Sequence, residues 1–169
     1  AQSDGGLASL FAELQSGNLA AGVSALDQAR GVMQANRAVA DRFGLALIAY
    51  EGGQHLTPYS PLGTSCNEWN NPAQCAPYFA IQNLYMAANR DARMGALYDD
   101  YLQAWSAETG SLFVHFAGLQ HNNGQYGSWG AKEYAGQADD SAPKYLALRR
   151  WQSALDSVRL FSNGFESDP

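Results

Sequence analysis

The chain has 169 residues, of which 46% are hydrophobic and 15% are charged, and its formal net charge at pH 7 is -6. This length is enough for one domain with a hydrophobic core. The negative charge argues against a nucleic-acid partner, because binding to phosphates requires a basic surface. No apolar run approaches the roughly 20 residues of a membrane span, so no membrane partner is expected. We expect one domain over residues 1–157 and a flexible tail over 158–169, where no hydrophobic period continues.

Two helices are predicted before the first strand. The first covers Leu7 to Gln15, and the second runs from about Leu19 to Phe43, with apolar residues at helical spacing. Gly44 is suited to end the second helix, since glycine readily adopts the left-handed conformation that follows many helices.

An unbroken apolar run, Leu45 to Tyr50, leads directly into Glu51, Gly52 and Gly53. A run that is apolar at every position is typical of a parallel strand covered on both faces. The sequence therefore predicts a strand over 45–50, with Glu51 at its carboxyl end, where α/β proteins hold ligands and catalytic groups. The alternative is a surface glutamate that begins a glycine-rich turn, and these residues alone favour neither interpretation.

The long loop over residues 52–76 contains both cysteines of the chain. Cys66 and Cys75 lie in one short polar stretch, which predicts a local disulfide and an oxidising compartment, so that the protein is secreted or periplasmic. Two free thiols are the alternative. No metal site is expected, because zinc requires four ligands and no His or further Cys is nearby. Trp69 in this loop suits a flat ligand such as a sugar, although a loop tryptophan also serves to pack the loop down.

Two further helices are predicted before the second strand, the first of them starting at Pro77. The second carries a stripe that fits one buried helix face: Met94, Leu97, Tyr98, Tyr101, Leu102 and Trp105. Gly110 ends this helix, and Leu112–Phe116 is predicted as the second buried strand. If the strands pair in parallel, His115 lies beside the end of the first strand. It is then either a hydrogen-bonded core residue or part of a site.

The stretch from Ala117 to Gly136 is polar, rich in glycine and partly aromatic, and it contains His121 and Trp129. Its amide groups are suited to recognising hydroxyl groups. Asp140 and Pro143 then mark the start of the last helix. The chain thus has two strand–loop–helix units, with the candidate polar groups on the loop side of both.

Two stretches together resemble a known family. Residues 49–55, Ala-Tyr-Glu-Gly-Gly-Gln-His, resemble the end of the seventh strand in (β/α)8-barrel retaining glycoside hydrolases. Residues 113–116, 126–131 and 142–145 are similar to the eighth strand, its loop and the closing helix of such proteins. The resemblance covers roughly residues 19–156. It implies an α/β fold made of the last two βα units of a TIM barrel, with parallel strands 45–50 and 112–116 and flanking helices, in a fragment of a secreted bacterial carbohydrate-active protein.

The resemblance also implies the roles of individual residues. Glu51 would be the nucleophile that forms a covalent glycosyl-enzyme, with a second carboxyl group about 5.5 Å away as the acid/base. Trp129 would give the aromatic floor for a sugar ring. No cofactor is implied. The residues that orient Glu51 or bind sugar hydroxyls would be Tyr50, Gln54, His55 and His115.

The expected acid/base residue is missing from the chain. In the barrels that the chain resembles, it follows the fourth strand, which these residues do not include. The other candidate carboxylates follow no buried strand: Glu68, Asp99, Asp100, Glu108 and Glu133. We therefore expect a poly- or oligosaccharide substrate, an acid/base outside this chain, and a partner in the missing N-terminal part of the same barrel.

Two other functions fit the same residues. The first is a non-catalytic secreted protein that binds carbohydrate in the same cleft, and the second is an independent small α/β domain with a structural role. A Ser-His-Asp hydrolase is disfavoured, because the sequence has no Gly-x-Ser-x-Gly elbow.

Overall fold

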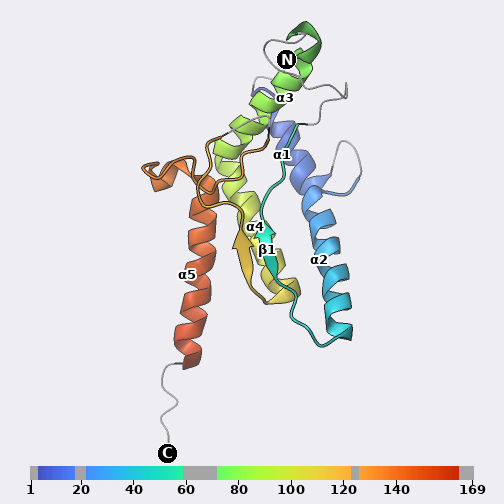
Figure 1. Ribbon diagram of the computed structural model, residues 1–169, viewed down its shortest axis with the longest axis vertical. Helices are drawn as coiled ribbons and strands as arrows, with labels where there is room; N and C mark the ends of the chain where they lie inside the picture. The colour runs from blue at the N-terminus through green and yellow to red at the C-terminus, as the bar shows by residue number, and fades with distance from the viewer. Residues whose placement is uncertain (1–3, 18–21, 59–71, 123–125, 164–169) are drawn as a thin grey trace, which may run out of the picture.

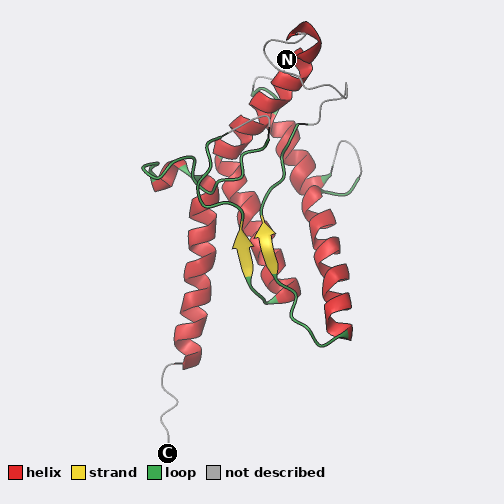
Figure 2. Cartoon of the chain, viewed as in Figure 1, coloured by secondary structure: helices red, strands yellow, loops and turns green. Residues whose placement is uncertain are grey.

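The computed structural model describes residues 4–17, 22–58, 72–122 and 126–163. Within them the fold is mixed α/β and mostly helical, with a two-stranded parallel sheet (Figure 1; Figure 2). The elements in chain order are α1 (Leu7–Ser16), α2 (Ala25–Arg42), β1 (Ala49–Gly52), α3 (Pro72–Arg90), α4 (Ala92–Thr109), β2 (Phe113–His115), the short 3-10 helix η1 (Asp139–Ser141) and α5 (Pro143–Asn163).

Helix α4 is the centre of the core. It lies behind both strands in Figure 1 and contacts α2, α3 and α5. The predicted stripe on this helix is confirmed as core, with Met94 and Leu102 fully buried. Apolar area removed from water is the main favourable term in folding, so this one helix face organises the packing of its neighbours.

Phe113 of β2 joins the sheet to the helices. Its ring lies edge-on to Tyr101 and Trp105 of α4, each at 5.7 Å between ring centroids, and to Trp151 of α5 at 5.9 Å. Edge-to-face aromatic pairs at such distances are favourable beyond the area they bury. One face of the sheet is therefore fixed against α4 and α5.

The two strands pair in parallel, as predicted, but the pairing is not regular. Ala49 lies opposite Phe113 and Gly52 opposite His115, so β1 uses one more residue than β2 between these pairs. This β-bulge interrupts the usual alternation of side chains, because an extra residue in one strand re-aims the side chains beside it. As a result Tyr50 and Glu51, although adjacent, are both exposed.

The prediction that both strands are buried on both faces is wrong for the described residues. Helices cover only one face, and on the other Tyr50 is 76% exposed and Val114 is 45% exposed. Ile48, Leu112 and Phe116 are also exposed large apolar residues. The strands are shorter than expected, at 49–52 instead of 45–50 and at 113–115 instead of 112–116. Beyond the ends of β2, the Leu112 carbonyl oxygen still accepts a hydrogen bond from the Ala49 N–H at 3.0 Å, and the Phe116 N–H donates to the Gly52 carbonyl oxygen at 2.9 Å.

Several helix ends differ from the prediction. Helix α2 starts at Ala25 because the Ser24 hydroxyl accepts a hydrogen bond from a backbone N–H of its first turn, at 2.9 Å. Phe43, the last residue of the predicted helix, follows α2 and is 72% exposed. The role of Gly44 is confirmed, since its φ of 63° lies in the left-handed region that follows the helix.

The last two predicted helix boundaries also move. Helix α3 begins at Pro72 and contains Pro77, so Pro77 does not mark its start. Helix α5 continues to Asn163, so the residues from 158 onward that were assigned to a flexible tail begin within a helix. Residues 164–169 lie outside the described part of the chain. None of the described helices combines the length and the apolar character that a membrane span needs.

Gly52 is where the ring of Phe113 meets the backbone of β1. A Cβ atom at Gly52 would lie 2.3 Å from the Phe113 ring, far inside van der Waals contact. The ring is itself held by three neighbours, so it has no free space to retreat into. Glycine is therefore required at this position for steric reasons.

We predict that Gly52→Ala lowers the free energy of unfolding by about 1–3 kcal/mol, the usual cost of overpacking a core. The matched control is Gly31→Ala in α2, where no atom lies within 4 Å of the added Cβ. The control should stabilise by up to about 1 kcal/mol, because alanine is the better helix former. Urea unfolding of both variants measures the difference, and equal stabilities would contradict the steric assignment.

Candidate functional site

Glu51 lies in an open cavity of about 300 Å³ at the carboxyl end of β1. Its side chain is exposed because the bulge turns it outward with Tyr50. The residues that line the cavity are Glu51, Gly52, Gly53, His55, Phe116 and Trp129. They provide one carboxylate, one imidazole, two further aromatic rings and the backbone of two glycines.

Trp129 lines this cavity together with Gly52 and Gly53, and hydrogen bonds of its backbone hold it in place. Its carbonyl oxygen accepts a hydrogen bond from the Ala117 N–H at 3.1 Å, and its own N–H donates to Gln120 Oε1 at 2.8 Å. The indole ring meets the His55 ring edge-on, at 4.5 Å between centroids, and lies 6.1 Å from the Phe116 ring. Such a pre-formed aromatic wall suits the apolar face of a sugar ring.

His115 does not line the Glu51 cavity. Its Nε2 lies 3.1 Å from the Tyr98 hydroxyl, which in turn accepts a hydrogen bond from the Gln54 N–H at 3.1 Å. The Tyr98 hydroxyl has one proton and two lone pairs, so this contact suits either neutral tautomer of His115. Instead, His115 borders a second cavity of about 330 Å³, together with Tyr145 and Leu148.

The protonation of His115 follows from its surroundings. Burial and, to a smaller extent, the positive charge of Lys144 lower its pKa to about 4, while the Ala117 backbone opposes the shift. The imidazole is therefore neutral at pH 7. Burial also raises the pKa of the Tyr98 hydroxyl. The hydrogen bond between Tyr98 and His115 therefore joins two neutral groups at pH 7.

Gln54 and His121 also point away from the Glu51 cavity. The Gln54 amide is turned inward, where Nε2 donates to Asn89 Oδ1 at 3.1 Å and to the Ser128 carbonyl oxygen at 2.8 Å. His121 is exposed and is not among the residues that line the cavity. Of the residues expected to surround Glu51, the structure brings only His55 and Trp129 into the same cavity.

The remaining predicted site residues are Tyr50 and Trp69, and the predicted disulfide joins Cys66 and Cys75. Tyr50 stands on the open face of the sheet. Trp69 and Cys66 lie outside the described residues, so the disulfide with Cys75, which is buried, stays a prediction.

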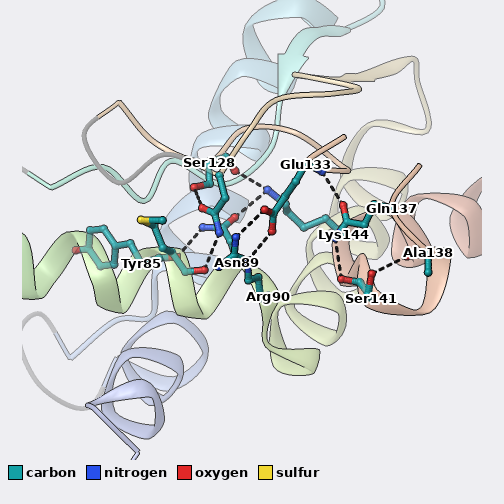
Figure 3. Close-up of polar contacts among 11 residues, drawn as sticks. Tyr85, Asn89, Arg90, Ser128, Glu133, Gln137, Ala138, Ser141 and Lys144 are labelled. Carbon is teal, nitrogen blue, oxygen red and sulfur yellow. Dashed lines mark hydrogen bonds and ion pairs between the residues drawn. The ribbon is translucent and has the colours of Figure 1, made fainter. Parts of the chain in front are cut away.

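A buried polar network behind the loops was not foreseen from the sequence. Lys144 of α5 is only 4% exposed, and its Nζ donates to Asn89 Oδ1 at 2.8 Å and to the Ser128 carbonyl oxygen (Figure 3). Beside it, Arg90 forms a bidentate ion pair with Glu133, at 2.6 and 2.7 Å. A lysine near the start of a helix is normally a surface residue, so no sequence signal marks this one as buried.

Other carboxylates are occupied away from Glu51. Asp99 pairs with Arg150 at 2.6 Å, Glu133 pairs with Arg90, and Glu108 accepts a hydrogen bond from Gln34 at 3.0 Å. Among the described residues, Glu51 is thus the single carboxylate that lines its cavity. In the same part of the chain, no three His, Cys, Asp or Glu side chains gather closely enough to hold a metal ion.

Comparisons of the chain with protein-family models, with curated proteins and with solved structures found no match.

We predict that His115 makes the free energy of unfolding fall between pH 6.5 and pH 4. Its folded pKa of about 4 lies below the ordinary 6.5, so the unfolded chain takes up a proton in this window before the folded chain does. The loss should be roughly 2 kcal/mol, since one pKa unit corresponds to about 1.4 kcal/mol and partial solvent contact weakens the effect. Urea unfolding across this window measures it. His115→Asn should flatten the slope, and an unchanged slope would contradict the assignment.

Proposed function

We propose that this chain is the C-terminal part of a retaining glycoside hydrolase. Glu51 is the nucleophile, and the acid/base residue lies outside this chain. The observation that carries the proposal is the single cavity that Glu51 shares with Trp129 and His55 at the carboxyl end of a parallel strand. Carboxylates at that edge act on ligands in many α/β enzymes, and aromatic rings bind the apolar faces of sugars. The substrate class is a poly- or oligosaccharide.

In the proposed reaction, a carboxylate oxygen of Glu51 forms a bond to the anomeric carbon while the glycosidic C–O bond breaks. The leaving oxygen takes its proton from the acid/base carboxyl group. Water then attacks the same carbon, gives a proton back to that group and releases Glu51. The exposure of Glu51 supports this role, since a nucleophile must reach the substrate from an open side.

The uncovered face of the sheet supports the proposal that β1 and β2 are the last two strands of a TIM barrel. In such a barrel, helices pack outside the strands, and side chains from all the strands fill the inside. Here α4 and α5 cover one face, while Tyr50, Val114 and Phe116 stand exposed on the other. Further strands, supplied by the N-terminal part of the same barrel, would bury this face and pair with the open edges.

We predict that the chain by itself binds a fluorescent dye specific for apolar surfaces, and that Val114→Lys reduces the dye signal. Since Val114 is already exposed, the substitution should change the free energy of unfolding by less than about 1 kcal/mol. The control is Val39→Lys on α2, an exposed valine remote from the sheet, which should leave most of the signal intact. Equal signals from the two variants would show that the open sheet face is not the dye site.

The second candidate function is non-catalytic carbohydrate binding. One observation favours it, namely that no second carboxylate among the described residues lines the cavity of Glu51. Retaining hydrolysis needs two such groups about 5–5.5 Å apart, whereas binding needs none. The experiment must therefore detect the nucleophile without requiring the acid/base residue.

Activated glycosides meet this requirement. A dinitrophenyl leaving group departs without a proton, and a fluorine beside the anomeric carbon slows the second step, so the glycosyl-enzyme accumulates. We predict that one member of a panel of such glycosides (gluco, galacto, manno and xylo) adds a single sugar to the wild-type chain, on Glu51, as detected by intact-mass and peptide mass spectrometry.

Two variants test whether the label is attached to Glu51. Glu51→Gln should lose it, whereas Glu108→Gln, at a carboxylate engaged elsewhere, should keep it. Sugar affinity without labelling, retained in Glu51→Gln, would favour the binding protein. The absence of both labelling and sugar affinity would refute both functions.

A further inference from the structure

Four polar atoms form a closed arrangement, and two of them belong to the residues that immediately precede His55 and Trp129. Two donors, Gln54 Nε2 and Lys144 Nζ, each donate to the same two acceptors, Asn89 Oδ1 and the Ser128 carbonyl oxygen. We call this arrangement the amide–lysine square. Its members come from the loop after β1, from α3, from the loop after β2 and from α5, so it joins four segments that are far apart in sequence. Figure 3 shows Lys144 reaching toward Asn89 and Ser128.

The orientation of both amides in the square is fixed by further hydrogen bonds. Asn89 Nδ2 donates to the Tyr85 carbonyl oxygen at 2.9 Å, which leaves Oδ1 to face the two donors. Gln54 Oε1 accepts from the Leu56 N–H at 2.6 Å, which leaves Nε2 to face the two acceptors. Each acceptor oxygen has two lone pairs and receives two donors, so the square is saturated.

The square lies next to the two rings of the cavity wall. Gln54 immediately precedes His55, and Ser128 immediately precedes Trp129. The two rings meet edge-on at 4.5 Å and line the cavity of Glu51. Because the square fixes the Gln54 side chain and the Ser128 peptide relative to each other, it also limits how far the next residue on each loop can move.

We propose that Lys144 is a positioning residue whose hydrogen bonds to Asn89 and Ser128, shared with Gln54, set the spacing between His55 and Trp129 in the Glu51 cavity. The role of Lys144 in setting the distance between the rings follows from hydrogen-bond geometry alone. The effect of that distance on sugar recognition rests on the proposed function.

Energetics support a role beyond general stability. A buried lysine that meets only neutral oxygens loses its hydration without gaining an ion pair, so its burial is weak evidence of a stabilising role. What a saturated polar network adds is one defined geometry. Burial also lowers the pKa of Lys144 to about 7, with the charge of Glu133 opposing. Charged or neutral, the amine keeps at least two N–H groups, which is the number that the two acceptors require.

The test uses the full 169-residue chain and the variant Lys144→Met. Met fills a similar volume but donates no hydrogen bond. We predict that the fold is retained, as judged by circular dichroism and cooperative unfolding, while the NMR cross-peaks between the His55 and Trp129 rings weaken and the Trp129 indole N–H resonance shifts. Trp129→Phe assigns that resonance among the four tryptophans. The matched control is Lys132→Met, which removes the only other lysine of the chain and should leave the ring contacts unchanged.

A second variant keeps the test decisive if Lys144→Met fails to fold. Gln54→Met removes the other donor of the same two acceptors and should disturb the same ring contacts. If both single variants fold, the double variant should disturb them by less than the sum of the two, because the residues act on shared acceptors. Unchanged His55–Trp129 contacts in a folded Lys144→Met or Gln54→Met chain would overturn the proposal.

The sugar-dependent arm separates this proposal from the proposed function. If an activated fluoroglycoside labels Glu51, labelling of Lys144→Met should be roughly tenfold slower, as expected from a small misplacement of substrate-binding groups. An unchanged rate would show that the ring spacing is irrelevant to the reaction and would refute that part. If the wild-type chain is not labelled, the proposed function fails, and the ring contacts still decide the role of Lys144.

Discussion

The contact between the Phe113 ring and Gly52 is the constraint on which the rest of this structure depends. The ring is surrounded by Tyr101, Trp105 and Trp151 on the helices and meets the bare backbone of β1 on the sheet. It therefore fixes where the sheet lies on α4 and α5 and how closely β1 approaches. A sheet with only two short strands has too few ladder hydrogen bonds to hold such a position by itself.

Because one face of the sheet is fixed in this way, the other face is left for function. The bulge in β1 turns Glu51 out of the normal alternation, so the carboxylate reaches the open side and not the helices. A regular strand with Ala49 on the helix side would have placed Glu51 on that side too. The exposure of the candidate nucleophile is thus a consequence of one extra residue between the two paired positions.

The loop after β1 is held from two directions. Its backbone N–H at Gln54 donates to Tyr98, which continues to the neutral His115, and the Gln54 side chain enters the amide–lysine square. Burial lowers the pKa values of both His115 and Lys144, and the charge of Lys144 lowers that of His115 as well. Neither reaches the Glu51 cavity. Their contribution is to a fixed geometry of the groups that do, which is the requirement for a pre-organised site.

The sequence by itself determined that the helices and two strands exist and that Glu51 lies at a strand end, since each depends on local periodicity and on turn residues such as Gly44 and Gly110. It could not determine the bulge, the exposed sheet face or the inward turn of Gln54. Those depend on which distant groups meet: Phe113 with Gly52, and Lys144 with Asn89 and Ser128. Only tertiary packing brings such partners together, because a buried lysine and a surface lysine look the same in a sequence.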